Sequence, residues 1–436
     1  MSKRITERSF NQGLLDYLTL SPTPFHAVDN TKAFLLDAGF ELLNEADTWQ
    51  LKPGGRYCVT RNDSSIIAFS LAKKNRVENG FHMVGAHTDS PCLKVKPNPN
   101  KKVKGYYQLG VEVYGGALLN PWFDRDLSLA GRVNYETKKG IIKNTLLNTN
   151  KPVAVIPSLA IHLDREANEN RTVNKQNHLA PILMLEQGNK KDNFQELLLA
   201  MLREINNISD VKQVLDYELF FYDSQAAAIT GLHDEFISSA RLDNLLSCYV
   251  GLMALLNAKP NRSTLLVCND HEEVGSASTS GAQGPFLKSV LERLFDSPEE
   301  LTRCLHNSMM VSADNAHGVH PNYPDKHDEN HGPVLNQGPV IKLNANQRYA
   351  TNSETSALFR QICQEAEENV QSFVVRSDMA CGSTIGPITA SELGVKTIDV
   401  GVPTFAMHSI REMAGSKDAF SLYKVLMKYF DHSAPK

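Results

Sequence analysis

The spacing of apolar residues predicts two helices at the start of the chain, followed by strands. Residues 8–43 carry apolar positions at helical spacing in two segments, which the SPTP sequence at 21–24 separates. The runs RYCVT and SIIAFSLA, on either side of Asn62-Asp63, predict a β-hairpin. The short apolar run at 81–86 predicts a buried strand, which leads directly into His87-Thr88-Asp89.

The pattern then changes twice along the chain. Residues 92–230 show alternating segments typical of antiparallel strands, with no clear helix before 193–206, and we interpret them as an inserted β-rich domain. After residue 231 helices and strands alternate. The expected helices are 243–258, 285–295, 353–369 and 419–430, and the expected strands are 264–268, 309–312, 373–376 and 397–400. This alternation predicts an α/β fold, a mixed sheet flanked by helices, in a discontinuous catalytic domain formed by 1–91 and 231–436.

Composition narrows the class of protein. The 436 residues include 45 Lys and Arg against 49 Asp and Glu, a net charge of −4 that does not favour nucleic acid or anionic lipid as a partner. Seven cysteines without CxxC spacing predict buried thiols in a reducing compartment. With no signal-peptide pattern and no apolar run of about 20 residues, the expected location is the cytoplasm, away from membranes.

Possible metal ligands follow several of the predicted strands. His87 follows the first strand, the acidic segment 270–273 the second, and Asp314 the third, while His408 comes shortly after the last. Asp243 lies at the start of a predicted helix. Each pattern alone is common in proteins without a metal, since an Asp at a helix start is usually a cap. Their joint occurrence at the ends of strands of one sheet, where α/β proteins bind ligands, predicts a site.

Imidazole and carboxylate ligands without thiolate suit zinc in an open catalytic site. The set His87, Asp243, Glu273, Asp314 and His408 offers one bridging carboxylate and four further ligands, which is what two co-catalytic metals need. Asp89 has the spacing to orient the His87 ring. One member of the Glu272-Glu273 pair would bind metal, and the other would act as general base.

Long motifs carry a resemblance to a known family. They include GAHTDSPCLKVKP, SARLDNLLSC, NDHEEVGSASTSGAQG, SADNAHGVHPNYPDKHDENHGP and AMHSIREMAG. Together they resemble the M18 metallo-aminopeptidases, which include the aspartyl aminopeptidases, over nearly the whole chain. The resemblance implies a di-zinc exopeptidase whose inserted β-rich domain forms dimers, and dimers that assemble into a dodecamer.

The same resemblance implies roles for individual residues. It makes Asp243 the bridging ligand, Glu272 the general base and Glu273 a ligand, and it keeps His87, Asp314 and His408 as ligands and Asp89 as the orienting acid. It places His320 near the substrate carbonyl and His162 in a neighbouring subunit's site. Lys342 falls where aspartyl aminopeptidases hold an acidic substrate side chain, although a solvated lysine at a strand end is the alternative; Met407 is a further predicted substrate contact.

The expected reaction is removal of an N-terminal residue from peptides with a free N-terminus, with Asp or Glu as the candidate preference. Two zinc ions per subunit are expected, with Co²⁺ or Mn²⁺ as substitutes. Two alternatives stay open. Another di-zinc amidohydrolase, such as a carboxypeptidase or an N-acyl amino acid deacylase, would use the same metals. A zinc-stabilised shell protein would have no activity, although it would have no use for an unligated base at Glu272.

Overall fold

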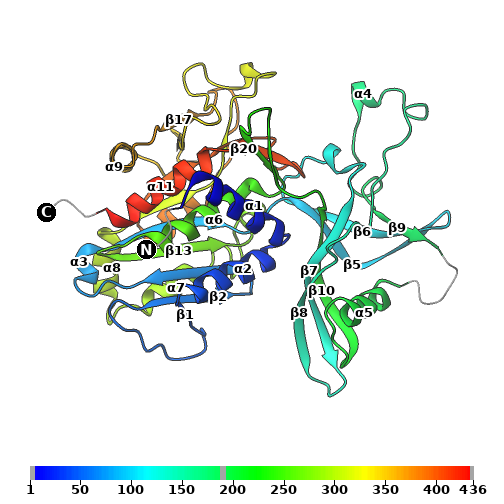
Figure 1. Cartoon of the computed structure of the whole chain (residues 1–436), viewed down its shortest axis with the longest axis horizontal. Coiled ribbons are helices and arrows are strands. Elements are labelled where there is room, and N and C mark those ends of the chain that lie inside the picture. The colour runs from blue at the N-terminus through cyan, green and yellow to red at the C-terminus, as the bar shows by residue number, and fades with distance from the viewer. Residues whose placement is uncertain (1–4, 187–192, 433–436) are drawn as a thin grey trace. The chain divides into compact units, whose positions relative to one another are not determined.

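The computed structural model describes residues 5–186 and 193–432. The chain divides into two compact units: residues 1–89, 227–407 and 412–436 in the first, and 90–226 with 408–411 in the second. From the sequence we expected the second unit to span residues 92–230, so the observed boundaries differ by a few residues. We did not expect residues 408–411 to belong to the second unit. Each unit has its own sheet and its own core (Figure 1).

A nine-stranded mixed sheet forms the centre of the first unit. Its strands in spatial order are β1 (Glu41–Leu42), β2 (Arg56–Arg61), β3 (Ser65–Ser70), β13 (Ser263–Asn269), β4 (Phe81–His87), β14 (Met309–Ala313), β18 (Lys396–Gly401), β16 (Val340–Leu343) and β17 (Gln371–Val374). The four central strands β13, β4, β14 and β18 run parallel, so their carboxyl ends meet at one edge. The predicted hairpin is present as the antiparallel pair β2–β3.

Helices cover both faces of this sheet, as the sequence predicts (Figure 1). The helices of the unit are α1 (Glu7–Leu20), α2 (Pro24–Asp37), α3 (Arg76–Asn79), α6 (Leu242–Asn257), α7 (Phe286–Glu292), α8 (Pro298–His306), α9 (Ser353–Glu365), α10 (Ile385–Leu393) and α11 (Asp418–Asp431). Helices α8 and α10 were not expected from the sequence.

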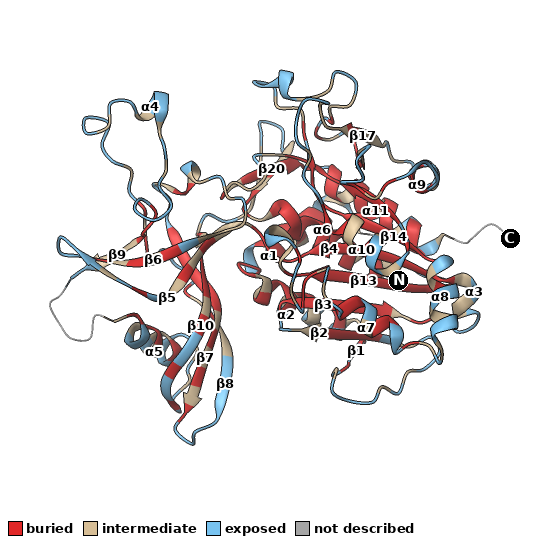
Figure 2. Cartoon of the chain, turned by 180° about the vertical axis from the view of Figure 1, so that it is seen from behind, coloured by how far each residue is buried: buried red, intermediate tan, exposed pale blue. Residues whose placement is uncertain are grey.

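Alternation along the buried strands fixes the two cores. In β4, Val84 and Ala86 belong to the core that contains α1, α6 and α11, whereas Met83 belongs to the core that contains α7 and α8. Successive side chains of a strand point to opposite faces, so a strand covered on both sides is apolar throughout. Figure 2 shows β4 and β13 buried along their length.

The expected break between the first two helices, at residues 21–24, has a local cause. Thr23 has extended backbone angles and its side chain accepts from the backbone N–H of His26, while Pro24 is the first helical residue of α2. A capping threonine followed by proline starts a helix for two reasons: the threonine side chain accepts from a free N–H group of the first turn, and proline has no N–H group to leave free.

The first unit also contains a small sheet that was not expected from the sequence. Its strands are β11 (Ala228–Thr230), β12 (Phe236–Ser239), β20 (Glu412–Gly415), β19 (Pro403–Phe405) and β15 (Ala316–His317). These strands are two to four residues long, too short to show alternation in the sequence.

The second unit is β-rich. It holds the antiparallel sheet β8 (Ile142–Asn148), β7 (Leu127–Thr137), β10 (Val211–Asp223), β5 (Cys92–Val103), β6 (Tyr106–Tyr114) and β9 (Ile182–Leu185). The predicted helix at 193–206 is α5 (Phe194–Glu204), and a single further turn forms α4 (Ala167–Asn170). Phe194, Leu198 and Leu202 of α5 are buried in the core of this unit.

Candidate active site

Predicted ligands from separate parts of the chain come together at the carboxyl edge of the central strands. His87 is the last residue of β4, and Asp314 follows directly on β14. Asp243 lies in the first turn of α6, where its φ and ψ of −84° and 104° depart from helical values. His87, Asp243 and Asp314 are all buried and each offers one ligand atom within 4.8 Å of the others.

The imidazole of His87 has a defined orientation. Its Nδ1–H donates to the backbone carbonyl of Asp89 at 3.1 Å, which leaves Nε2 as the nitrogen that can bind a metal. Nε2 lies 3.4 Å from Oδ1 of Asp243 and 3.7 Å from Oδ1 of Asp314. Two ligand atoms of a tetrahedral zinc ion, each about 2.0–2.1 Å from the metal, are about 3.3 Å apart, so this arrangement fits the ion.

The paired glutamates lie on a short 3₁₀ turn that follows β13. This turn, η2 (Glu272–Val274), brings Glu272 and Glu273 close enough to His87 to form a second group of possible ligands. Asp89 holds the turn in place, because one carboxylate oxygen accepts from the backbone N–H of Glu272 and the other from that of Glu273, both at 3.1 Å. The carboxylate of Asp89 is 3.5 Å from Nδ1 of His87, so it supports the glutamate turn as well as the histidine.

Electrostatics at this edge favour a bound cation. Burial, together with the carboxylates of Asp314, Glu273 and Asp243, raises the pKa of Glu272 to about 8, against the influence of His87. Burial lowers the pKa of His87, but the carboxylates of Asp243, Asp314 and Asp89 outweigh it and raise the pKa overall. Buried carboxylates are stable when a cation compensates them, and a zinc dication suits these oxygen and nitrogen donors.

Lys342 is buried beside one of these carboxylates. It lies on β16 with 2% of its surface exposed, and its Nζ is 3.3 Å from Oδ2 of Asp314 and donates to the carbonyl of Asn315 at 3.1 Å. The alternative of a solvated lysine at a strand end is therefore wrong, because the side chain points into the unit and not toward water.

Three residues that position the predicted ligands were missed in the sequence. Glu412 of β20 accepts from the backbone N–H of Asp243 at 2.9 Å, and Asn244 donates to the carbonyl of Ala313, directly before Asp314, at 2.8 Å. The thiol of Cys248 donates to the carbonyl of His87 at 3.0 Å. The two residues of each hydrogen bond are far apart in the chain, so no local sequence pattern predicts the contact.

The remaining predicted site residues are divided between the two units. His408 begins the segment 408–411 of the second unit, where its Nδ1–H donates to the carbonyl of Gly116 at 3.2 Å. His162, also in the second unit, is exposed. His320 is half-buried in the first unit, its ring against those of Tyr323 and Phe405, and Met407 is half-buried after β19.

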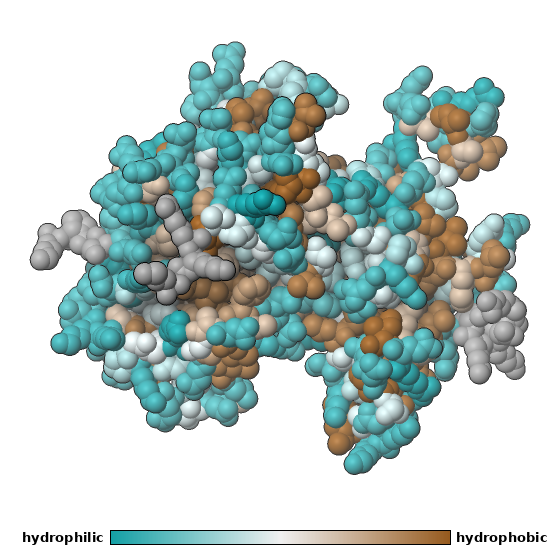
Figure 3. All heavy atoms as spheres, viewed as in Figure 1, coloured by the Kyte–Doolittle hydropathy of each residue, from teal (hydrophilic) through white to brown (hydrophobic). Residues whose placement is uncertain are grey.

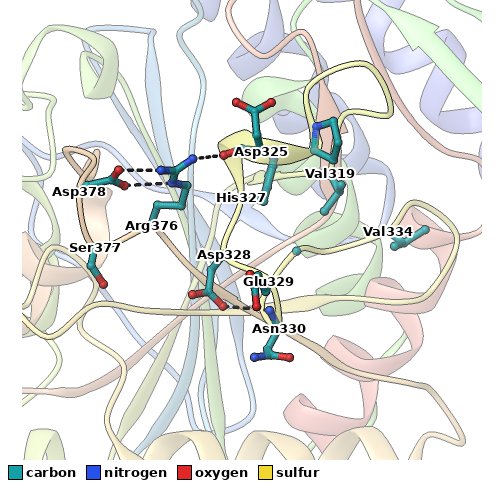
Figure 4. Close-up of a pocket in the computed structure, with 12 residues that line it drawn as sticks. Val319, Asp325, His327, Asp328, Glu329, Asn330, Val334, Arg376, Ser377 and Asp378 are labelled. Carbon is teal, nitrogen blue, oxygen red and sulfur yellow. Dashed lines mark hydrogen bonds and ion pairs between the residues drawn. The ribbon is translucent and has the colours of Figure 1, made fainter.

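A cavity of about 980 Å³ lies beside the loop 319–334, which carries His320. Figure 4 shows its carboxylates, with Arg376 turned onto Asp378. Arg376 donates to both carboxylate oxygens of Asp378, at 3.0 and 2.6 Å, and also to the carbonyl of Asp325. None of the predicted metal ligands lines this cavity, so it is distinct from the cluster at the strand ends.

Comparison with known proteins decides the family. A family model described as aminopeptidase I zinc metalloprotease (M18) matches residues 17–430. The chain belongs to the M18 family. A probable M18 family aminopeptidase 2 of Ectopseudomonas mendocina is 60% identical over 422 residues, which cover 96% of this chain and 97% of the relative. The protein is therefore a zinc metalloprotease of the aminopeptidase class, which sets aside the other amidohydrolases and the inactive shell protein.

Solved structures of M18 aminopeptidases share the fold. A chain in the cryo-EM structure of the Ape4 and Nbr1 complex is 40% identical with a TM-score of 0.94, covering 97% of this chain and 86% of that one. The S. cerevisiae mApe1, solved as a dodecamer, is 31% identical with a TM-score of 0.84, covering 97% of this chain and 96% of that one. The expected α/β fold with a separate β-rich part is thus confirmed. Within the described residues, no helix has the length and apolar character needed to cross a membrane.

Proposed function

We propose that this M18 aminopeptidase removes the N-terminal residue of peptides with two zinc ions per subunit, held by His87, Asp243, Glu273, Asp314 and His408. The observation that carries the proposal is the convergence of His87, Asp243 and Asp314 at the strand ends, with the glutamate turn beside them. The hydrogen bond from Nδ1 of His408 to Gly116 supports its role, because it leaves Nε2 as the ligating nitrogen. Co²⁺ or Mn²⁺ would suit the same donors.

The chain's own residues supply the proton transfer. When bound, the metal pair supplies Lewis-acid polarisation of the scissile carbonyl and makes a water molecule more acidic. Burial and the neighbouring carboxylates raise the pKa of Glu272, so its ionised carboxylate is basic enough to take a proton from that water and return it to the leaving amine. A nearby dication lowers this pKa, which keeps the carboxylate ionised at the start of the reaction.

His320 is the proposed donor to the substrate carbonyl. Its Nδ1 accepts from the backbone N–H of Asn322 at 3.2 Å, so in the neutral ring the proton is on Nε2, which can donate. A donor aimed at the oxygen where negative charge develops stabilises the transition state.

A pair of single substitutions distinguishes the roles of the two glutamates. Glu272→Gln should keep both metals and lower kcat by about 10²-fold or more, because a general base is removed. Glu273→Gln should lose metal first, because a ligand is removed. Metal content and kcat are measured on the same samples; metal loss in the Glu272 variant with full retention in the Glu273 variant would reverse the two roles.

We propose a preference for Asp or Glu at the substrate N-terminus, with Lys342 as the cation that attracts the side chain and Met407 as a further contact. The burial of Lys342 supports a charge held in a defined place, although the same charge also compensates Asp314. Lys342→Met should therefore lower kcat/KM for all substrates and lower it further for Asp and Glu than for Leu. The ratio between Asp and Leu substrates is the readout, and a wild-type enzyme that prefers Leu would contradict the acidic preference.

We further propose that the active site is shared between subunits through His162, in an assembly built from dimers that reaches the dodecamer. Leu159, Ile161 and Leu163, which flank His162 along the chain, are 58%, 48% and 74% exposed. Figure 3 shows apolar atoms gathered on the part of the chain around α4. Large exposed apolar side chains in one place are typical of an interaction surface.

The test of sharing mixes two inactive variants, His162→Ala and Glu272→Gln, after dissociation and reassembly. In a mixed dimer one site combines the intact His162 of one chain with the intact Glu272 of the other, so about a quarter of all sites should recover if pairing is random. The same mixture without dissociation is the control. Verified mixed dimers without activity would place His162 outside the partner's site.

A further inference from the structure

A second cavity of the first unit carries an unusual charge. It encloses about 640 Å³, within the range of small-molecule sites, and lies where β2 and β13 begin and β3 and α6 end. Because β13 is seven residues long, this end of the sheet is about 20 Å from the cluster of metal ligands. The cavity is thus separate from the proposed catalytic centre.

The lining of this cavity is cationic. Arg56, Lys73, Lys74 and Arg262 all line it, together with three asparagines, and no carboxylate does. The chain as a whole has a net charge of −4, so four positive charges without a negative one stand out from the average surface. Among the described residues, no ion pair involves Lys73, Lys74 or Arg262.

Arg262 is the strongest indication of a ligand. Only 8% of its surface is exposed. A guanidinium has five N–H groups, and among the described residues one of them has a protein acceptor: it donates to Nε2 of His82 at 2.9 Å. His82 is buried, and burial together with the charge of Arg262 lowers its pKa to about 3. A neutral imidazole accepts a hydrogen bond but does not cancel the charge of the guanidinium.

A buried charge that nothing compensates is costly, and proteins normally pair it. The carboxyl-terminal carbonyls of α6 attract cations and account for lysines at this end of the helix. They do not account for Arg262, because its hydrogen bond goes to His82 and not to α6. An anion in the cavity would complete the coordination of Arg262.

We propose that this cavity binds a small phosphate-bearing anion. Guanidinium groups match the oxygens of a phosphate in a planar fork, and lysines add point charges around it. Arg56 is already held in position, since its Nη2 donates to the carbonyl of Ala38 at 2.6 Å and its guanidinium lies over the ring of Phe40. The cavity volume accommodates a nucleoside monophosphate as well as the free ion.

The test measures binding of inorganic phosphate and of adenosine 5′-monophosphate to the zinc-loaded protein by calorimetry at constant ionic strength. The double variant Lys73→Met/Lys74→Met removes two exposed charges from the cavity rim and should weaken binding roughly 2- to 30-fold. The control is Lys138→Met/Lys139→Met, which removes an equally exposed adjacent pair from the second unit and should bind as the wild type does.

The outcomes separate the sources of binding. Anion bound at the metal centre gives the same affinity in all three proteins, and that result would overturn the proposal, as would absence of binding to the wild type at 10 mM. Tighter binding of the nucleotide supports an organic phosphate as the ligand, and equal binding supports the free ion. As a second readout, phosphate should raise the Tm of the wild type, and Arg262→Met should remove most of that rise.

Discussion

The carboxylate of Asp89 connects His87, a proposed metal ligand, to the turn that carries both glutamates. It is 1% exposed, and each of its oxygens accepts one backbone N–H of that turn at 3.1 Å. Asp89→Asn keeps the size of the side chain but replaces one acceptor oxygen with an NH₂ group. Whichever way the amide turns, one of the two N–H groups then faces a donor instead of an acceptor.

The magnitude follows from these contacts. A hydrogen bond to a charged group contributes about 1.5–3 kcal/mol, and the buried N–H left without an acceptor adds a cost of the same order. We therefore expect unfolding to become easier by about 2–4 kcal/mol. Displacement of Glu272 by a fraction of an ångström should lower kcat about 10- to 100-fold, and altered support of His87 should weaken metal binding by a similar factor.

The assay compares Tm, zinc content after dialysis and kcat for Asp89→Asn and for the control Asp37→Asn, which makes the same chemical change at an exposed position at the end of α2. The control should match the wild type in all three. If Asp89→Asn also kept the Tm, the zinc and the kcat of the wild type, the two backbone contacts would not hold the glutamate turn, and the reasoning would be refuted.

Three further predictions concern packing, pH and metal. A Cβ at Gly401 would lie 1.8 Å from the carbonyl oxygen of Asp314, so Gly401→Ala should displace this predicted ligand and lower the zinc content. Gly382→Ala is the control, because a Cβ there meets open space, and it should keep its zinc. Equal zinc content in the two variants would contradict the prediction. The folded-state pKa of His82, about 3, lies below its ordinary value of 6.5. Its contribution to stability is therefore present above pH 6.5 and is lost as the pH falls toward 3. By pH 5 the free energy of unfolding should have fallen by about 2 kcal/mol on this account. His82→Gln should therefore lose less Tm than the wild type between pH 7 and pH 5, and an equal loss would count against the buried neutral ring. Removal of metal with a chelator should lower the Tm, because the carboxylates around His87 then lack a compensating cation; an unchanged Tm would mean that metal binding is not coupled to folding.

Local patterns in the sequence predicted many of the helices and strands and the candidate ligands at their ends. Alternation and short apolar runs predicted β2, β3, β4 and β13, because the side-chain period of a strand is visible within a few residues. His87 and Asp314 could be placed at one edge from sequence, since parallel neighbouring strands end side by side. The short strands of the small sheet and helices α8 and α10 were missed, because their patterns are too brief or too weak.

The support of the site was decided by the tertiary structure alone. Asp89 meets the backbone of Glu272 across 183 residues, and Glu412 holds the backbone of Asp243 across 169. The sequence left open whether Lys342 is solvated, and only the fold buries it against Asp314. Contacts of this kind depend on which strands become neighbours, and a single sequence carries the identity of each partner but not the pairing. The sequence by itself thus determined which groups could do chemistry, and the fold determined which of them meet.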